Sequence, residues 1–428
     1  MLDLEIVPER SLGCDAWEFV LGMHFSQSVA IIQSQVGTIR GVQVLYSDQN
    51  PLSVDLVINM PQDGIRLIFD PVAQRLKIIE IYNMKLVKLR YSGMCFNSPE
   101  ITPSIEQVEH CFGATHPGLY DSQRHLFALN FRGLSFYFPV DSKFEPGYAH
   151  GLGSLQFPNG GSPVVSRTTI YYGSQHQLSR SSSGGRCAAP LADLPLSCYR
   201  HQLHLRRCDV LRSATATLGL RLHIYTEGTR STDSPQARRR VVRFGDSCQA
   251  VARALAAPAR LYYKADDKMR IHRPTARRRP PPASDYFFNY FTLGLDVLFD
   301  ARTHQVKKFV LHTNYPGHYN FNMYHRCEFE LTVQPDKCES NALVESRGAV
   351  QVTAYSRWEG VSRALRVCER PVVLNRASST NTTNPFGSTF CYGYQDIIFE
   401  VMSNNYIASI TLYQPEGARP HYAVNSIA

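Results

Sequence analysis

The chain has 428 residues, of which 43% are hydrophobic and 11% aromatic, so it is long enough and apolar enough to build two or more hydrophobic cores. Its eleven cysteines include no C-x-x-C pair, which argues against a zinc ribbon, a thioredoxin-type site and a secreted disulfide framework. No apolar run approaches the roughly 20 residues of a membrane-spanning helix, and the acidic start Met1-Leu-Asp-Leu-Glu5 is unlike a signal peptide. These features predict a protein of a reducing, cytoplasmic compartment.

The net charge of +9 belongs to one part of the chain. Residues 174–283 contain 21 Lys and Arg against 7 Asp and Glu, a balance of 21 − 7 = +14, so the remaining residues carry −5. A basic pI that comes from one segment is weak support for nucleic-acid binding by the whole protein. The arginine runs also lack the interleaved aromatic residues that stack on bases, and we predict no nucleic-acid partner.

In chain order, the sequence predicts four helices, each followed by antiparallel strands. Three of them precede copies of one pattern: a glycine, an alternating run that ends in Phe and an acidic residue, a polar connection of six residues and a second strand. The predicted helices span 21–35, 102–112, 244–257 and 356–368, and the copies begin at Gly64, Gly294 and Gly393, the last with one extra residue before its Phe. After the helix at 102–112, strands are predicted at 126–130 and 134–140.

The repeated pattern predicts an α+β fold of about four modules, each a helix followed by antiparallel β-hairpins. The alternative is that any antiparallel protein repeats hairpins. We expect the modules to pair into about two domains, because a single module leaves a sheet face or edge uncovered. The predicted parts are an N-terminal domain at 1–173 with modules 21–100 and 101–173, a basic, partly flexible inserted segment at 174–243, a C-terminal domain at 244–415 with modules 244–333 and 350–414, and a frayed tail at 416–428.

The stretch from Asp285 to Leu331 is dense in aromatic residues, and Asn314-Tyr-Pro-Gly317 within it is typical of a turn. Aromatic residues anchor protein interfaces, so this turn could be a partner-binding patch, or it could pack on the neighbouring sheet. The patch residues are Tyr315, Tyr319, Phe321 and Tyr324.

Near the N-terminus, Asp15-Ala-Trp-Glu-Phe-Val20 places an acidic residue ahead of an aromatic-x-x-aliphatic motif. Autophagy ubiquitin-like proteins bind such a motif as an added strand and fill two pockets with its side chains, here Trp17 and Val20. The alternative is that Trp17 and Phe19 are strand residues that pack on the first helix. The sequence favours this alternative, because the segment has the pattern of a folded strand.

Two arginine runs, Arg238 to Arg240 and Arg277 to Arg279, fall in predicted loops. Guanidinium groups bind phosphate well because each presents paired donors. The runs are candidates for an anionic-lipid site made of Arg238, Arg239, Arg240, Arg277, Arg278 and Arg279, or else they are solvated linker residues.

The sequence contains no G-x-S-x-G elbow, phosphate loop, dinucleotide fingerprint or H-E-x-x-H motif. Four histidines (His304, His312, His318 and His325) and Cys327 could ligate zinc, but their spacing favours hydrogen-bonded or solvated histidines. We therefore predict a protein that is not an enzyme and holds no cofactor or metal. The alternative is a hydrolase whose Asp, His or Cys residues come together only in space.

Several long blocks of sequence together carry a family resemblance. They are Met1 to Gly13, Phe112 to Gly118, Asn130 to Phe136, Asp285 to Gly294, Lys307 to Arg326 and Asn384 to Cys391. These blocks resemble the phagosome assembly factor family over roughly 1–173 and 244–415. Residues 174–243 are only loosely similar, and the Arg/Pro-rich stretch 273–283 departs from the family pattern.

The resemblance implies a non-enzymatic regulator of autophagy, a scaffold or adaptor in complex with a WD-repeat propeller protein of the breast-carcinoma-amplified-sequence type. It further implies recruitment from the cytoplasm to the phagophore assembly site, which carries phosphoinositides. The resemblance assigns no functional residue. A trafficking protein that binds acidic lipid directly is the alternative from a second class.

Overall fold

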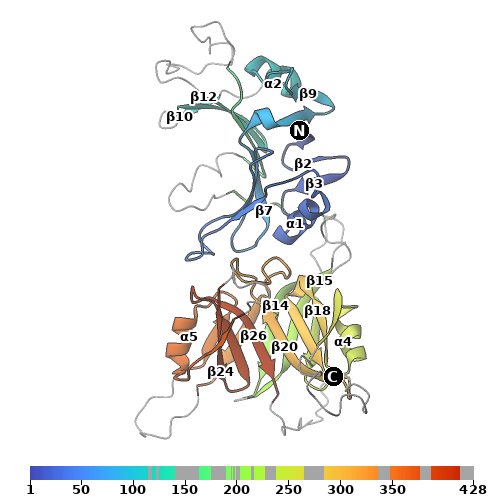
Figure 1. Ribbon diagram of the computed structural model, residues 1–428, viewed down its shortest axis with the longest axis vertical. Coiled ribbons are helices and arrows are strands. Elements are labelled where there is room, and N and C mark those ends of the chain that lie inside the picture. The colour runs from blue at the N-terminus through green and yellow to red at the C-terminus, as the bar shows by residue number, and fades with distance from the viewer. Residues whose placement is uncertain are drawn as a thin grey trace, which may run out of the picture. The chain divides into compact units, whose positions relative to one another are not determined.

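The computed structural model of the chain divides into two compact units, Met1–Cys198 and Tyr199–Ala428 (Figure 1). It describes residues 1–113, 118–121, 125–139, 163–174, 189–193, 195, 198, 203–213, 216–226, 238–264, 284–335, 348–375 and 387–414. The predicted tail at 416–428 lies outside these residues. The α+β prediction is confirmed: the described residues form four α-helices and four largely antiparallel sheets.

The first unit contains two modules in sequence. The first comprises β1 (Leu2–Val7), β2 (Ser11–Cys14), β3 (Trp17–Val20), α1 (Phe25–Ser34), β4 (Gln43–Leu45), β5 (Leu56–Met60), β6 (Ile65–Phe69) and β7 (Leu76–Ile81). The second comprises η1 (Met84–Leu86), β8 (Val87–Tyr91), β9 (Met94–Asn97), α2 (Ile105–Phe112), β10 (Leu119–Asp121), β11 (Leu126–Phe131), β12 (Leu134–Pro139) and β13 (Arg167–Tyr171).

The second unit repeats this order. Its first module comprises β14 (Leu203–Arg212), β15 (Thr217–Thr226), β16 (Arg238–Arg243), α4 (Cys248–Leu255), β17 (Arg260–Tyr263), β18 (Tyr286–Tyr290), η5 (Phe291–Leu293), β19 (Leu295–Phe299) and β20 (Val306–His312). Its second module comprises β21 (Phe329–Val333), β22 (Val350–Thr353), α5 (Trp358–Leu365), β23 (Val372–Leu374), β24 (Thr389–Tyr394), β25 (Ile397–Val401) and β26 (Ile407–Tyr413). The helices α4 and α5 lie at opposite flanks of this unit, with the strands between them (Figure 1).

Within each unit the two modules share a small sheet and a large sheet. The small sheets have the order β3-β2-β1-β8-β9 and β16-β15-β14-β21-β22, and the large sheets β10-β11-β12-β13-β7-β6-β5-β4 and β17-β18-β19-β20-β26-β25-β24-β23. The last strands of the two modules pair antiparallel at the centre of each large sheet, β7 with β13 and β20 with β26. Each large sheet therefore consists of two four-stranded halves that are hydrogen-bonded edge to edge.

The four helices confirm the four predicted helices. Each buries one narrow apolar stripe, and the residues recur at the three- or four-residue spacing that places them on one helix face. The buried positions are Phe25, Ser28 and Ile32 in α1, Ile105, Val108 and Cys111 in α2, Val251 and Leu255 in α4, and Trp358, Val361 and Leu365 in α5. Serine N-caps begin α2 and α4: Ser104 accepts from the amide of Gln107 and Ser247 from that of Ala250, satisfying amides that a helix start leaves unbonded.

One backbone bridge recurs at the start of every helix. The residue before the helix pairs with the chain just before the last strand of its module in all four cases: His24 with Arg75, Ser104 with Val164, Ser247 with Gln305 and Arg357 with Tyr406. Chance repetition of hairpins does not reproduce a long-range contact at the same module position four times. The bridges therefore support duplication of one module.

The predicted alignment of the third copy was wrong by two residues. Strands β6, β19 and β25 begin at Ile65, Leu295 and Ile397, and each has a register shift before its last residue, Phe69, Phe299 and Val401 respectively. Val401, not Phe399, is therefore the equivalent of the two phenylalanines. Gly393 lies inside β24, and the following connection, 402–406, is one residue shorter than its counterparts 70–75 and 300–305.

In two copies, the acidic residue of the pattern accepts hydrogen bonds from backbone amides of the connection that follows it. Asp70 accepts hydrogen bonds from the amides of Val72 and Ala73, and Asp300 accepts from those of Thr303 and Arg302. Because these amide bonds favour the carboxylate form, they lower the pKa of Asp300 to about 2. The acidic residue of the sequence pattern therefore has a structural role, which is to hold the turn of the connection.

The predicted inserted segment at 174–243 differs from the structure. Leu203 to Arg243 supplies β14, β15 and β16, which are three of the five strands of the small sheet in the second unit. Cys208, Leu222 and Val242 on these strands are at most 1% exposed, so the segment contributes core. Its basic residues obscured the strand pattern because they occur on both faces of these strands, with Arg239 on the outward face and Arg238 and Arg240 beside the buried Ile224 and Leu222.

Gly294 and Gly393 provide a test of the corrected alignment. Gly294 has φ +63°, and a Cβ there would lie 2.5 Å from the carbonyl oxygen of His325. Gly393 is exposed and has open space around it. We expect Gly294→Ala to lower the free energy of unfolding of the second unit by about 1–3 kcal/mol and Gly393→Ala to change it by under about 0.5 kcal/mol.

The measurement is urea unfolding followed by the fluorescence of Trp358, in a Trp17→Phe background that removes the other tryptophan. Equal losses for the two alanine variants would contradict the alignment.

Candidate functional site

The aromatic segment 313–326 leaves β20 and runs over the face of the large sheet that is turned away from the helices. Three of its side chains fasten it: the Tyr324 hydroxyl donates to the carboxylate of Asp296 at 2.9 Å, the Tyr315 hydroxyl to the carbonyl of Ala354 at 2.9 Å, and Arg326 Nε to the carbonyl of Thr313 at 2.9 Å. Burial raises the pKa of both tyrosines, and in Tyr324 the charge of Asp296 raises it further. We call this segment the aromatic loop.

Two of the four residues of the predicted partner-binding patch are buried and cannot form its surface. Tyr315 is fully buried and Tyr324 is 5% exposed, whereas Tyr319 is 42% exposed and Phe321 is half-buried. The packing alternative is therefore correct for Tyr315 and Tyr324. Of the four, Tyr319 is the one that offers a large surface to a partner.

Beneath the aromatic loop lies a chain of buried polar residues from five strands and the loop. His312 Nε2 is 2.9 Å from Asp296 Oδ2, and His312 Nδ1 is 3.3 Å from the amide nitrogen of Asn320. The oxygen of Asn320 contacts His318 Nδ1, and His318 Nε2 is 3.3 Å from Glu400 Oε1. Glu400 also accepts from Thr389 at 2.8 Å and Ser409 at 2.7 Å.

This buried chain contains an Asp–His pair of the kind that hydrolases use, but its atoms are already engaged. Both ring nitrogens of His312 have partners, and the Tyr324 ring stacks on it with centroids 3.9 Å apart. His304 is likewise bonded, to the Tyr286 hydroxyl at 2.9 Å. The sequence predicted solvated or hydrogen-bonded histidines in place of zinc ligands. His304, His312 and His318 are hydrogen-bonded, and the His325 ring lies against that of His204, with centroids 5.8 Å apart.

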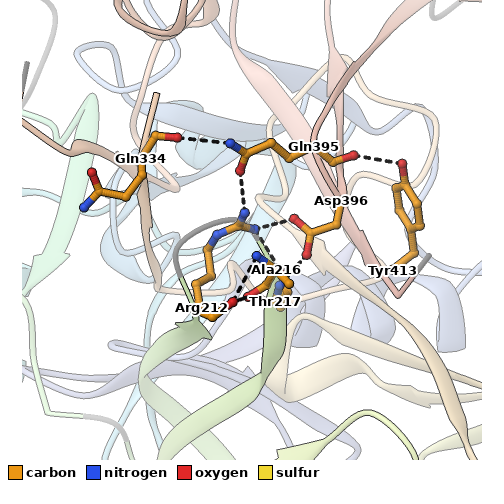
Figure 2. A network of polar contacts seen from close by, with 8 residues as sticks. Arg212, Ala216, Thr217, Gln334, Gln395, Asp396 and Tyr413 are labelled. Carbon is orange, nitrogen blue, oxygen red and sulfur yellow. Dashed lines mark hydrogen bonds and ion pairs between the residues drawn. The ribbon is translucent and has the colours of Figure 1, made fainter. Parts of the chain in front are cut away.

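A second buried network surrounds Arg212 at the end of β14 (Figure 2). Its guanidinium group contacts Asp396 Oδ1 at 2.6 Å, Thr217 Oγ1 at 2.7 Å and Gln395 Oε1 at 2.7 Å. Gln395 in turn donates to the carbonyl of Gln334 at 3.1 Å and its own carbonyl accepts from Tyr413. The network ties the β14–β15 turn to the β24–β25 turn, and so joins the two modules of the second unit.

A hollow of about 350 Å³ lies beside this network. It is lined by Val210, Arg212, Ser213, Thr332 and Gln334. The side chain of Arg212 is only 4% exposed, and a buried ion pair is stable when hydrogen bonds compensate its lost hydration. The guanidinium group of Arg212 in the wall of the hollow is therefore bonded to Asp396, Thr217 and Gln395 of the protein itself.

The first three arginines of the predicted anionic-lipid site do not share one face, because successive residues of a strand point to opposite sides of the sheet. Arg238, Arg239 and Arg240 lie on β16, an edge strand, and not in a loop. Arg239 pairs with His223, whereas Arg238 and Arg240 pair with the buried Ile224 and Leu222. Arg239 therefore lies on one face of the sheet, and Arg238 and Arg240 lie on the other. Arg277, Arg278 and Arg279 lie outside the described residues.

The outward face of this small sheet is rich in arginine. Arg239 and Arg243 stand on β16, Arg221 and His223 on β15, and Arg207 on β14, where Asp209 lies among them. Asp209 is 2.5 Å from Arg207 Nε and 3.2 Å from His223 Nε2. Burial alone would raise the pKa of Asp209, but these two bonds lower it overall. We call these outward residues the basic face. The sequence did not reveal it, because Arg238 to Arg240 were predicted to lie in a loop and 174–243 in a partly flexible inserted segment.

The predicted ubiquitin-like-protein motif is enclosed. Trp17 and Val20 on β3 are 9% and 7% exposed, and the Trp17 ring lies 5.0 Å from that of Phe19. A strand-addition motif must insert both side chains into the partner's pockets. The alternative, that Trp17 and Phe19 are core strand residues, is the one that the structure supports.

Among the described residues, no helix combines the length and apolarity needed to cross a membrane.

The fold and these sites define a class of protein: an α+β protein of four related modules, in which the buried His312, His318 and Glu400 are engaged in hydrogen bonds with other described residues. What its surface presents is a basic sheet face and exposed apolar strands at the sheet edges.

The comparisons with known proteins agree over nearly the whole chain. The family described as phagosome assembly factor 1 matches residues 15–413. A PHAF1 protein of Drosophila melanogaster is 62% identical over 423 residues, which is 96% of this chain and 94% of its own length. PHAF1 proteins of Caenorhabditis elegans and Arabidopsis thaliana are 34% and 36% identical, over 97% and 94% of this chain and 94% and 92% of their own lengths. The chain belongs to the phagosome assembly factor 1 family; no solved structure matches it.

The buried state of Trp17 gives a prediction for the N-terminal strand. Trp17→Ala should lower the free energy of unfolding of the first unit by about 3–5 kcal/mol, because it leaves a cavity beside Phe19. Asp15→Ala, at the exposed acidic position of the motif, should change it by under about 0.5 kcal/mol. Differential scanning calorimetry of the full chain checks both, and a Trp17→Ala protein that melts like the wild type would show that Trp17 is not a core residue.

Proposed function

We propose that this protein is a non-enzymatic regulator of autophagy. It acts as a scaffold or adaptor in complex with a WD-repeat propeller protein of the breast-carcinoma-amplified-sequence type, and it is recruited from the cytoplasm to the phosphoinositide-bearing phagophore assembly site. The observation that carries the proposal is family membership: phagosome assembly factor 1 describes a match over residues 15–413. Relatives in an insect, a nematode and a plant align over nearly their whole lengths.

The surface of the described residues supports a binding role. Large apolar side chains are exposed on the outer edge strands of both large sheets, including Val44 and Leu45 on β4, Leu261 on β17 and Val372 on β23, each at least 41% exposed. Exposed edge strands invite pairing with another chain and are usually blunted or covered. A protein that keeps several of them is suited to assembly with partners.

The buried polar residues support the non-enzymatic part of the proposal. His312 and His318 use both ring nitrogens within the protein, and burial raises the pKa of the Cys327 thiol, which disfavours the nucleophilic thiolate. The alternative of a hydrolase assembled from Asp, His or Cys residues has less support, because these groups hold the aromatic loop on its sheet.

A second candidate function, direct binding to acidic membranes, is favoured by the basic face. Arg239 and Arg243 form no ion pair with any described residue that the structure shows, in contrast to Arg207, which contacts Asp209 and Glu330. Two guanidinium groups on a sheet face, with no ion-pair partner among the described residues, can reach lipid phosphates.

The partner proposal predicts co-elution. Co-expressed with the propeller protein, the full chain should elute from gel filtration as one stoichiometric complex. Tyr319→Ala should weaken the complex about tenfold or more, because tyrosines are enriched among the few anchor residues whose truncation costs about 2 kcal/mol or more. Tyr172→Ala is the matched control, since Tyr172 is 41% exposed and lies in the other unit.

Separate elution of two well-folded proteins would contradict the scaffold proposal. An equal effect of the two tyrosine substitutions would contradict the role of Tyr319 and leave the complex itself standing.

The lipid proposal predicts salt-sensitive binding of the full chain to vesicles that contain phosphatidylinositol 3-phosphate, measured by co-sedimentation. The double variant Arg239→Ser/Arg243→Ser should bind about 10- to 30-fold more weakly, at about 1 kcal/mol per arginine near a membrane surface. The control Arg253→Ser/Arg302→Ser removes the same charge from exposed positions elsewhere in the unit. Equal losses in both variants would indicate a general charge effect and not the basic face.

A further inference from the structure

The strand β4 is an outer edge of the first unit's large sheet, and it lacks the usual protection of such an edge. Residues 41–47, which include β4, contain no charged residue and no proline. The outermost strands at the other three edges differ, because Arg260 begins β17, Asp121 ends β10 and Pro371 directly precedes β23. Native edges are normally protected by charge, proline or a covering segment. The edge at β4 is therefore open to pairing with a further strand.

The apolar row on the core face of this sheet continues to the edge and is exposed there. Val44 lies opposite Ile58, which lies opposite Leu67. Ile58 and Leu67 are fully buried, whereas Val44 is 41% exposed. Tyr46 follows two residues later on the same side of the chain and is 42% exposed. Of the described strands, only β5 pairs with β4, so a further strand at this edge would cover both side chains.

The nearest charged residues on the two sides of Val44 have opposite signs and equal spacing. Arg40 lies four residues before Val44 and Asp48 four residues after it, and both are exposed. Both already interact within the chain, Arg40 with the carbonyl of Gly37 at 3.1 Å, so a contact with a second chain would be added to these. An incoming strand with charge of one sign at both ends would meet like charge at one end of this edge.

This spacing selects one register for a second copy of the same strand. In an antiparallel pair, residues that bond to the partner strand alternate with residues that do not. Two identical edges can therefore bond only when the two-fold axis between them passes through a residue. With the axis at Val44, Arg40 of each copy lies opposite Asp48 of the other. An axis one residue to either side places neither of them opposite a charged residue.

From these observations we infer that β4 is a self-association edge, at which two copies of this chain pair as antiparallel strands with the two-fold axis at Val44. The large sheets of the two first units become one continuous sheet. Val44 and Tyr46 of each copy are covered on its core face, and the two Arg40–Asp48 pairs fix the register. A two-fold contact uses the same surface on both copies and closes after two, so the product is a dimer. The inference goes beyond the proposed function and does not depend on the propeller partner.

The test is sedimentation velocity of the full chain over a wide range of concentration. The wild type should pass from monomer to dimer as its concentration rises, and hydrogen exchange at the amides of β4 should slow in the dimer. Val44→Lys should weaken the dimer about tenfold or more, because it places like charges opposite one another at the axis. Val373→Lys is the matched control and should leave the dimer unchanged, since Val373 is 55% exposed on β23, an outer edge of the second unit.

An exchange of charge tests the register. Arg40→Asp should weaken the dimer about tenfold, because it places a carboxylate opposite Asp48 at two symmetric positions. Asp48→Arg should weaken it to the same extent, because it places a guanidinium group opposite Arg40. The two substitutions together restore opposite charges at both positions and should return the affinity to near that of the wild type. These variants keep the test valid even if Val44→Lys folds poorly.

Three results would overturn the inference. One is a full chain that stays monomeric at every concentration; if Val44→Lys then also abolished co-elution with the propeller protein, the edge would belong to that partner. Another is a dimer that Val44→Lys weakens no more than Val373→Lys does. The third is a double charge variant that dimerises no better than Arg40→Asp alone. A dimer that forms as expected while the propeller protein elutes separately would support the inference and contradict the scaffold proposal alone.

Discussion

Antiparallel pairing between the last strands of sister modules is the interaction on which each unit depends. In the second unit it runs from Lys308 opposite Tyr413 to His312 opposite Ser409, and in the first it joins β7 to β13. A four-stranded module alone would end at a long apolar edge, because Phe309, Leu311, Ile410 and Leu412 are all fully buried at this seam. Pairing converts two such edges into the centre of one sheet.

The same pairing explains where the surface remains open. Once the long inner edges are paired, the edges that remain on each large sheet among the described strands are its outermost strands, which are three or four residues long. They diverge in sequence although they occupy equivalent places, and the one at β17 combines aromatic side chains with positive charge. Duplication therefore supplied several similar edges, and their side chains then diverged in sequence.

Buried polar groups fasten the connections to the sheets and differ between the copies in the same way. Lys77 is fully buried and bonds Asp55 at 2.6 Å, while the equivalent Lys307 is 41% exposed and bonds Asp285 at 3.1 Å. In the second unit, the aromatic loop and its Asp296–His312 pair cover the sheet face instead. A buried ion pair contributes little net stability against a well-packed apolar pair, but removing one partner is costly, so such pairs fix one arrangement of loop and sheet. This is the role that the structure gives to the histidines that sequence alone left open to chemistry.

The sequence by itself determined the local elements and the family. Helix periodicity at 105–112 and 248–255, strand alternation in Leu295–Phe299 and the acid at Asp300 all arise from contacts within a few residues, which a single sequence displays directly. Only the tertiary structure decided that Tyr315 is core while Tyr319 is surface, that Arg239 faces away from Arg238, and that Trp17 is enclosed. Burial and facing depend on distant parts of the chain. In the basic segment Leu203–Arg212, Leu205 and Cys208 are buried because the core of the second unit packs on one face of the strand.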